Sequence, residues 1–593
     1  MSEKTYKISP WNLDALFTGI KSEDVSQTLQ RVEENTGKFE TYREKLSPEM
    51  DIEDFYEAIT LSEKIYLDVA KLSQYAFLKF SSNTQDTEAM TFMGKMDQIN
   101  AEVQNRLLFF SLWWKGLEDD EAQKFMVRAG EYEYYLKQLR NFKPYTLGEE
   151  EEKIINLKNV TGSSAIKSVY EAITNRLTFK LTIDGEEKEL TQSELLQNVY
   201  STDADLRAAA YQELFRVYGN EGPVLGLLYQ NYARDYVNEN VKIRGMETPI
   251  SHRNLVNDVP DDVVEALLDV AKQNTHIFHR FFGLKAKWLK LEKLRRYDIY
   301  APVADDAQKT YAFNDAAHMV LEAFKEFDPK IATLAQRVLD ESHIDSEVRK
   351  GKMGGAYNYG VDPAMTPFVL MNYIGKPRDA ATLAHELGHS IHGMMASHHN
   401  LFNAHAPLPL AETASTFGEM LLTDKLLAEE KDAGVKRDIL FAQMDDAFAT
   451  ILRQCFFAIF EKDAHQAINE GASVDDICEI YSKNLQEQFG DSVELYDEFK
   501  WEWVYVAHFY DRPFYVYAYA FGQLLVFALY QQFKQEGRSF IPRFMTILSD
   551  GGSMSPIDIL DKAGVDIRTA EFWQGGFDVI SEMVDQLEQI PVG

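Results

Sequence analysis

The sequence predicts a mostly α-helical protein with two helical lobes and a small β-sheet. Apolar residues recur three and four positions apart among charged ones over long stretches, which is the spacing of one helix face. Proline is scarce, with 17 in 593 residues, and the alternation typical of strands is confined to short segments. A chain of 593 residues is also far longer than one hydrophobic core supports, so two or more lobes are expected.

The first part of the chain is predicted to be an N-terminal helical domain over residues 1–200. Helical spacing of apolar side chains is clear over residues 51–140. Near the end of this domain, residues 176–184 alternate and run into Asp184-Gly185, which is typical of a hairpin turn. Residues 201–205 are typical of a helix N-terminus after a break, so a second, larger domain is predicted over residues 201–593.

A second extended segment, residues 367–375, directly precedes a predicted helix. We expect this helix to begin at Asp379, because aspartate is a good N-cap and Pro377 stands just before it. The small sheet is therefore expected beside this helix. The segment around Val369–Tyr373 is the predicted strand that pairs with an extended ligand backbone.

The composition excludes several classes of protein. Lys plus Arg is 61 and Asp plus Glu is 94, a net charge of −33 that repels nucleic acid. The two cysteines, Cys455 and Cys478, form neither a disulfide framework nor a cysteine metal site. The chain shows no signal peptide pattern and no run of about 18 apolar residues. We therefore expect a cytoplasmic protein that does not cross a membrane.

Residues 385–389 read His-Glu-Leu-Gly-His on the predicted helix. At about 100° per residue, His389 lies about 40° from His385 around the helix axis, and both histidines lie opposite the apolar stripe. Glu386 lies about 100° from His385, beside the pair. Two imidazoles one turn apart bind one zinc ion from the same side, and Glu386 stands beside them as a general base. The alternative is a solvent-facing helix with two idle histidines.

The third zinc ligand is predicted to be Glu412. One class of zinc peptidase continues the motif to a third histidine, but position 395 is Met395, which excludes that class. His392 lies on the ligand face, yet three ligands over two turns of one helix span too far for one tetrahedral ion. Glu412 shares one face of a following helix with Ser415 and Glu419, and either of these two can supply a hydrogen bond that orients the ligands. A surface glutamate is the alternative for Glu412.

These residues and their surroundings resemble the thimet-oligopeptidase-like zinc peptidases of family M3, and specifically the oligoendopeptidase F branch. The resemblance lies in residues 372–392, in Glu412-x-x-Ser415 and in the opening residues 8–17, and it covers essentially the whole chain. It implies a helical shell around a deep substrate channel. It also implies one Zn²⁺ ion per chain and cleavage of short unstructured peptides, while the oligomeric state stays open.

A later segment, residues 508–522, is similar to the His/Tyr segment of that family, whose side chains face the scissile carbonyl. The resemblance implies that Tyr510 and Tyr517 bind the oxyanion and that His508 assists them, with Tyr515 and Tyr519 as competing choices. Aromatic clusters are often simply core, which is the other interpretation. Residues 349–357 resemble a glycine-bearing loop that lies near substrate in the family, although an ordinary glycine turn has the same composition.

The predicted activity is hydrolysis of internal peptide bonds in short oligopeptides by a metal-activated water. His385, His389 and Glu412 hold the zinc ion, and Glu386, Tyr517, Tyr510 and His508 carry the chemistry. A zinc exopeptidase of the peptidyl-dipeptidase or carboxypeptidase type is the alternative. The second alternative is a peptide-binding scaffold without turnover. Glu386 argues against it, because a structural zinc site needs no general base.

Overall fold

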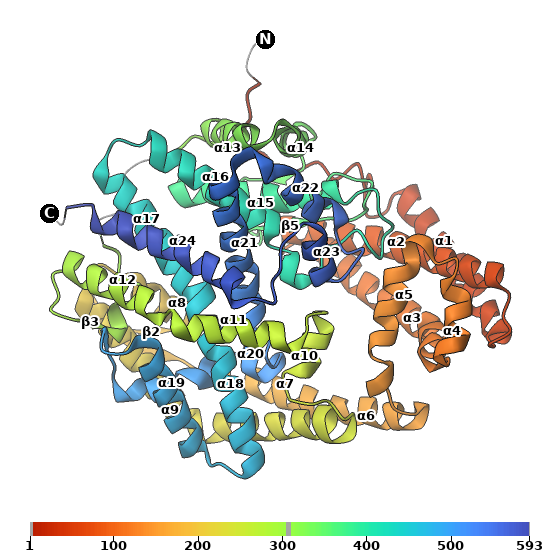
Figure 1. Cartoon of the computed structure of the whole chain (residues 1–593), viewed down its shortest axis with the longest axis horizontal. Coiled ribbons are helices and arrows are strands. Elements are labelled where there is room, and N and C mark those ends of the chain that lie inside the picture. The colour runs from red at the N-terminus through yellow and green to blue at the C-terminus, as the bar shows by residue number, and fades with distance from the viewer. Residues whose placement is uncertain (1–3, 304–309, 592–593) are drawn as a thin grey trace. The chain divides into compact units, whose positions relative to one another are not determined.

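The computed structural model describes residues 4–303 and 310–591, which are mostly helical (Figure 1). Helices hold 70% of the residues and strands 4%, which confirms the predicted fold class. The chain forms two compact units, each built from three segments. Unit 1 comprises residues 1–144, 309–428 and 532–565, and unit 2 comprises residues 145–308, 429–531 and 566–593. The boundaries of these units differ from the predicted domain boundary near residue 200. The two predicted domains stay a prediction.

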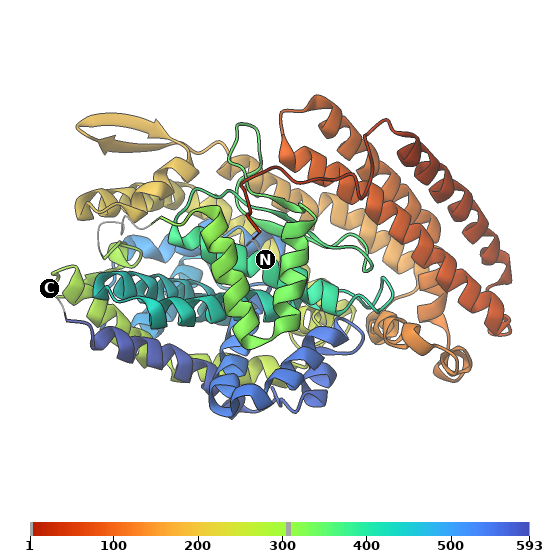
Figure 2. The ribbon, with the colours of Figure 1, turned by 90° about the horizontal axis from the view of Figure 1, so that it is seen from above.

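Unit 1 begins with long helices that lie side by side, as Figure 2 shows in red and orange. They pack around a buried aromatic core that includes Phe55 and Trp114, both fully buried. Asp51 and Asp86 cap two of these helices by accepting hydrogen bonds from the first turn. The helices are α1 (Glu23–Glu40), α2 (Ile52–Ser82), α3 (Thr87–Gly116), α4 (Asp119–Met126) and α5 (Glu133–Asn141).

The rest of unit 1 surrounds the predicted site helix, α15, which spans Pro377–Met395. It begins two residues before the predicted start, because Pro377 occupies the first helical position, where a missing N–H costs nothing. Asp379 is therefore the third helical residue and not the predicted N-cap, and its carboxylate accepts hydrogen bonds from the Ile374 and Lys376 amides that precede the helix. Its neighbours include α13 (Phe313–Phe327), α14 (Pro329–Asp340), α16 (Thr413–Glu429) and α22 (Ile541–Asp550), and α23 (Pro556–Lys562) packs on α22.

The sheet of unit 1 has three short strands in the order β4–β6–β5. β6 (Phe368–Leu370) is central, since it pairs with β4 (Ile344–Asp345) in parallel and with β5 (Tyr357–Tyr359) in antiparallel orientation. The expectation that Val369–Tyr373 pairs with a ligand backbone is therefore wrong for the strand itself, because both of its edges are occupied. β5 is the edge strand beside α15.

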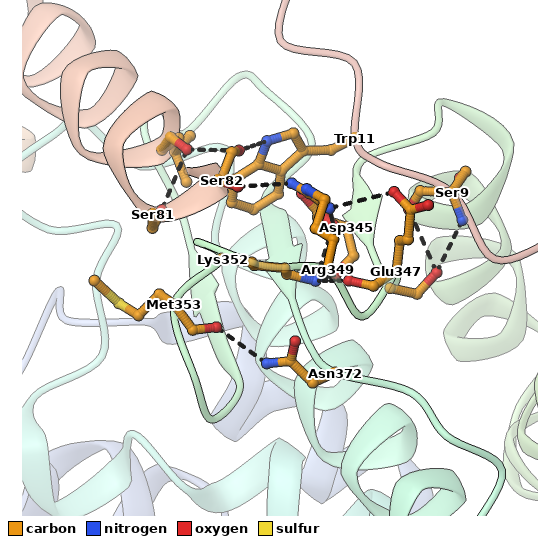
Figure 3. Close-up of polar contacts among 12 residues, drawn as sticks. Ser9, Trp11, Ser81, Ser82, Asp345, Glu347, Arg349, Lys352, Met353 and Asn372 are labelled. Carbon is orange, nitrogen blue, oxygen red and sulfur yellow. Dashed lines mark hydrogen bonds and ion pairs between the residues drawn. The ribbon is translucent and has the colours of Figure 1, made fainter. Parts of the chain in front are cut away.

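The loop that joins β4 to β5 is held by a buried ionic cluster (Figure 3). Lys352 is fully buried, pairs with the Asp345 carboxylate at 2.9 Å and donates to the backbone carbonyls of Asp345, Glu347 and Met371. Arg349 pairs with the same carboxylate and donates to the Ser82 carbonyl at the end of α2. The glycine-bearing loop of residues 349–357 is thus tied to its unit from several sides.

Unit 2 is organised around the 34-residue helix α9 (Ala204–Val237), which Asp203 caps as the sequence predicts. The predicted hairpin is also present, with β1 (Phe179–Ile183) paired to β2 (Glu186–Leu190) through Asp184 and Gly185, both at positive φ (Figure 2). A two-stranded parallel pair joins β3 (Leu294–Arg295) to β7 (Val493–Glu494). Two helices, α20 (His508–Asp511) and α21 (Tyr517–Glu536), carry the His/Tyr segment.

The remaining helices complete unit 2, and four of them, α7, α8, α18 and α19, contact α9 directly. None of the helices in residues 4–303 and 310–591 is long and apolar enough to cross a membrane. The helices are α6 (Glu149–Thr161), α7 (Ser163–Thr174), α8 (Gln192–Gln197), α10 (Ser251–Val256), α11 (Asp261–Gln273), α12 (Thr275–Trp288), α17 (Ala433–Ala447), α18 (Arg453–Glu470), α19 (Val474–Phe489) and α24 (Ala570–Glu588).

Candidate metal centre and active site

The two histidines of the His-Glu-Leu-Gly-His segment lie one turn apart on α15 and point to the same place. Their ring centroids are 4.8 Å apart and their Nε2 atoms 3.1 Å apart. The opposite face of the helix, including Leu383, Leu387 and Ile391, is buried in unit 1. The helical spacing therefore presents both imidazoles on the polar face, as predicted.

Glu412 completes a group of three potential metal ligands with His385 and His389. It stands immediately before α16, after the short turn Leu408–Leu410. Its Oε2 atom lies 3.4 Å from the Nε2 atom of each histidine. The structure thus brings together the three residues that the sequence predicts as zinc ligands.

Two glycines allow α15 and α16 to approach closely enough for this arrangement. A Cβ atom on Gly388, within the His-Glu-Leu-Gly-His segment, would lie 2.5 Å from the Ala414 carbonyl oxygen and 2.5 Å from the Ser415 Cα atom. A Cβ atom on Gly418 would lie 3.2 Å from the Ala384 carbonyl oxygen. Only glycine fits a backbone contact as close as that at position 388.

Each ligand is oriented by a second hydrogen bond. Glu419 contacts the Nδ1 atom of His385 at 2.5 Å, and the Ser415 hydroxyl donates to Glu412 Oε2 at 2.7 Å. His389 is hydrogen-bonded to the Ala411 backbone. Such partners set the tautomer and the angle of the ligand, so both Ser415 and Glu419 act where the sequence suggested either of them.

The three donor atoms fit a zinc ion. A tetrahedral ion with bonds of about 2.0–2.1 Å separates its donors by roughly 3.3 Å, close to the 3.1–3.4 Å found here. The surroundings also favour a cation. Burial lowers the pKa of His385, but the hydrogen bond to Glu419 and the nearby carboxylates outweigh it and raise this pKa to about 9.

Glu386 lies beside the donor atoms and is nearly buried. Its side chain is 5% exposed, and its Oε2 atom has no hydrogen-bond partner among the described residues. Burial raises its pKa to about 7. The Asn358 amide of β5 donates to the Glu386 backbone carbonyl and to Ser390, which anchors α15 to the edge strand. A carboxylate with an uncommitted oxygen is suited to proton transfer.

A cavity of about 530 Å³ opens in front of these groups, within unit 1. The edge strand forms one wall through Tyr357, Asn358 and Tyr359, and the ligands form another. His392 lines this cavity but is absent from the group of potential metal ligands found in the described part of the chain. Burial lowers the pKa of His392 to about 4, so it is neutral at physiological pH.

The predicted oxyanion residues belong to unit 2. Tyr510 and Tyr517 are fully buried. The Tyr510 hydroxyl donates to the Leu225 carbonyl at 3.3 Å and its ring stacks on Tyr170, while the Tyr517 hydroxyl accepts from Asn257 at 2.8 Å. Both hydroxyls therefore form hydrogen bonds within the interior of unit 2. Their predicted role in catalysis stays a prediction.

The three other polar rings of the same segment lie nearer the surface of unit 2. His508 and Tyr519 are exposed, and the Tyr519 hydroxyl lies 3.4 Å from His508 Nε2. The Tyr515 ring stacks parallel to His508, with guanidinium groups of Arg253 and Arg512 within 5.7 Å of its centroid. An accessible hydroxyl is the one that reaches a ligand, so accessibility favours Tyr515 and Tyr519 over Tyr510 and Tyr517.

Several contributors to the site were missed by sequence reasoning. Asn358 and His405 line the cavity from segments without a recognisable motif. The polar character of Asn358, shortly before the site helix, was the one signal that could have pointed to it. Gly388 and Gly418 are visible in the sequence, but the contacts that they allow exist only where two helices cross.

Known proteins resemble this chain along most of its length. Residues 197–579 match the family model described as Peptidase family M3, and residues 113–179 match the model described as Oligopeptidase F. "Oligopeptidase PepF" of Bacillus subtilis (strain 168) is 26% identical over 98% of this chain and 87% of its own length. "Oligoendopeptidase F homolog" of Borreliella burgdorferi is 26% identical, with 98% of each chain covered.

Solved structures share the fold along the whole chain. A structure titled as a putative peptidase from Chlamydophila abortus superposes with a TM-score of 0.88 at 23% identity, covering 99% of this chain and 100% of that one. Oligoendopeptidase F from Enterococcus faecium gives a TM-score of 0.72 at 23% identity, covering 96% and 99%. Because the family model spans well over half of the sequence and includes the metal centre, the chain belongs to peptidase family M3.

Proposed function

We propose that this chain is a zinc-dependent endopeptidase that hydrolyses internal bonds of short, unstructured oligopeptides. The observation that carries the proposal is the ligand group His385, His389 and Glu412, with donor atoms 3.1–3.4 Å apart beside the buried Glu386. The names of the relatives from Bacillus subtilis and Borreliella burgdorferi, oligopeptidase and oligoendopeptidase, support the substrate class. The deep substrate channel and the cytoplasmic location stay predictions.

The residues of unit 1 divide the chemistry between them. His385, His389 and Glu412 would hold the zinc ion, which would supply a Lewis acid for the peptide carbonyl and for water. Glu386 accepts the proton of the attacking water on its uncommitted Oε2 atom and then donates it to the leaving amine nitrogen. Asn358 and Ser390 hold the backbone of Glu386 in place during both transfers.

The edge strand β5 supplies the backbone that holds the peptide. Tyr357–Tyr359 lines the cavity and has one edge that no described strand pairs with, so an extended peptide adds to the sheet there by main-chain hydrogen bonds. β5 thus takes the place that the sequence assigned to residues 369–373. Recognition through the backbone would disfavour folded proteins, whose backbone is already paired.

By the family resemblance, we propose that the His/Tyr segment of unit 2 donates hydrogen bonds to the scissile carbonyl. Tyr519 and His508 are the favoured donors because both are exposed, with Tyr515 beside them. Negative charge develops on that carbonyl oxygen in the transition state, where hydroxyl donors are most effective. Tyr510 and Tyr517 would then anchor the segment through their buried hydrogen bonds to Leu225 and Asn257.

Metal analysis combined with cleavage mapping tests this proposal. We expect about one zinc ion per chain and internal cleavage of peptides blocked at both termini. Activity should vanish on chelation and return with added zinc. An exopeptidase would leave blocked peptides intact, and a scaffold would bind peptides without cleaving them.

A further inference from the structure

The His/Tyr segment of unit 2 contains a tight turn at residues 512–515, between α20 and α21. The Tyr515 amide donates to the Arg512 carbonyl at 3.1 Å, which closes a four-residue turn. Pro513 occupies the second position, and Phe514 occupies the third with φ of +58°. Proline at the second position and a positive φ at the third define a type II turn.

The third position of a type II turn normally carries glycine. Here it carries phenylalanine, whose Cβ makes the left-handed conformation unfavourable. The turn would relieve this strain by rotating the peptide unit between Pro513 and Phe514 by about 180°, which converts type II to type I. The observed conformation therefore needs support from the surrounding structure.

Two side chains form hydrogen bonds with the peptide unit between Pro513 and Phe514, one with its N–H and one with its C=O. Glu461 of α18 accepts a hydrogen bond from the Phe514 amide on its Oε1 atom at 2.9 Å, in a fully buried environment. Arg253 of α10 donates from Nε to the Pro513 carbonyl at 3.4 Å. Rotation of the peptide unit would break both contacts.

The same helix also holds the Phe514 ring. His465 lies one turn after Glu461 on α18, and its ring centroid is 4.8 Å from that of Phe514. Tyr236 of α9 packs on the same ring from another side, at 6.2 Å. α18 thus fixes both the backbone and the side chain of the strained residue. Hydrophobic anchoring of Phe514 explains why glycine is not used here.

The consequence of this support lies one residue further along the chain. Tyr515 follows Phe514 directly, its ring lies parallel to His508 at 5.8 Å, and its centroid is 5.3 Å from that of Tyr519. A flip of this peptide unit would leave the neighbouring Cα positions nearly in place but would re-aim the Cβ atom of Phe514, so its ring would lose the contacts with His465 and Tyr236. The anchored Phe514 therefore holds the start of the segment that carries Tyr515 and Tyr519.

We infer that Glu461 is a positioning residue of this peptidase, which locks the turn at residues 512–515 so that His508, Tyr515 and Tyr519 stay in their working arrangement. The inference rests on the proposed role of these three side chains in catalysis. Glu461 acts through the Phe514 amide and does not touch the substrate. A fully buried carboxyl group is costly, and the bond to the Phe514 amide gives that burial a structural purpose.

Replacement of Glu461 by two different residues tests the inference. Glu461→Leu removes the acceptor, whereas Glu461→Gln keeps an oxygen for the Phe514 amide. For the leucine variant we expect kcat on a quenched peptide to fall about 10- to 100-fold, with KM and zinc content nearly unchanged. The glutamine variant should stay within about threefold of the wild type. Glu470→Leu, at an exposed position of the same helix, is the matched control.

A double-mutant cycle with Tyr519→Phe separates positioning from general stability. If Glu461 acts through the His/Tyr segment, Glu461→Leu should cost much less in a Tyr519→Phe background than in the wild type. Additive losses, an unchanged kcat in Glu461→Leu, or an equal loss in Glu461→Gln would each overturn the inference. A normal kcat for Tyr519→Phe alone would instead refute the proposed role of Tyr519, which is a separate failure.

Arg253 provides the second route if the leucine variant does not fold. It is half-buried and holds the other end of the same peptide unit. Arg253→Met should lower kcat in the same way and again lose most of its effect in the Tyr519→Phe background. A wild-type kcat in a folded Arg253→Met protein would contradict the inferred dependence of catalysis on the turn at residues 512–515.

Discussion

At the scale of single residues, the proposed mechanism assigns metal binding and proton transfer to different side chains, with Glu386 as the proton carrier. The ligands contact one another within 3.4 Å, whereas Glu386 belongs to the same helix but lies outside the ligand group. Its uncommitted oxygen and raised pKa suit a group that takes up and returns one proton per cycle. Removing it should therefore affect turnover and leave the metal in place.

Glu386→Gln tests this separation. We expect the variant to retain about one zinc ion per chain and to lose activity by about 10³-fold or more, because an amide accepts no proton. Metal content and cleavage of a quenched peptide measure the two properties independently. Wild-type turnover in this variant would rule out Glu386 as the base.

Glu419 is the residue that orients His385. Glu419→Gln weakens the 2.5 Å contact to Nδ1 and makes the imidazole a poorer ligand, so zinc affinity should fall about 10- to 100-fold. A competition titration with a zinc chelator measures the change. Glu429→Gln, at the exposed end of the same helix, serves as the control and should keep the wild-type affinity.

Substitutions of Tyr519 and Tyr517 are expected to have different effects on turnover and stability. If the exposed hydroxyl is the one that meets the substrate, Tyr519→Phe should lower kcat about 10- to 1000-fold with little loss of stability. Tyr517→Phe should instead cost stability, because it leaves the buried Asn257 amide without its partner. Steady-state kinetics and thermal melts of both variants distinguish the assignments, and the reverse pattern would restore the original choice of Tyr517.

At the scale of secondary-structure elements, the metal centre depends on how closely α15 and α16 cross. The histidines come from one helix and Glu412 from the start of the other, so their spacing is set by the crossing itself. Gly388 and Gly418 let the backbones touch at this point. Glycine costs about 1 kcal/mol in a helix interior, and here the close approach compensates for it.

Gly388→Ala should therefore disrupt the centre without touching a ligand. The new methyl group would lie 2.5 Å from backbone atoms of Ala414 and Ser415, which cannot move as a side chain does. We expect a loss of about 1–3 kcal/mol of stability and a lower zinc affinity. Gly393→Ala is the matched control, since its methyl group meets only Pro367 at 3.7 Å within the described residues. Equal behaviour of the two variants would contradict this account of the crossing.

At the scale of the whole molecule, buried carboxyl groups link stability to pH. Burial raises the pKa of Glu461 to about 8 from a usual value of 4.5. The folded chain therefore keeps this proton over a range where the unfolded chain has released it. Stability from this group is complete below about pH 4.5 and is lost as the pH rises toward 8.

Glu461→Gln removes this dependence because an amide does not titrate. Relative to the wild type, the variant should gain stability progressively between about pH 5 and pH 8, by on the order of a few kcal/mol at the upper end. Denaturant unfolding of both proteins at several pH values measures the difference. A constant difference across this range would show that Glu461 does not carry a raised pKa.

Much of the fold and the ligand set follow from sequence because they depend on local spacing. The 3.6-residue period determines which side chains share a helix face, so His385 and His389 converge wherever α15 lies. The Asp184-Gly185 turn and the Asp203 cap likewise depend only on residues within a few positions. Net charge and cysteine count are properties of the composition, so they need no knowledge of the packing.

What only the tertiary structure decided involves contacts between distant segments. The central place of β6, and hence the role of β5 as the edge strand, depends on pairing with β4 across an intervening loop. The burial of Tyr510 and Tyr517 and the exposure of Tyr519 depend on which helices pack around one segment. The sequence alone predicted which residues can hold a metal ion. The helix crossing at Gly388 decided where Glu412 meets the two histidines, because the approach of two backbones depends on packing between distant segments and produces no periodic pattern in the sequence.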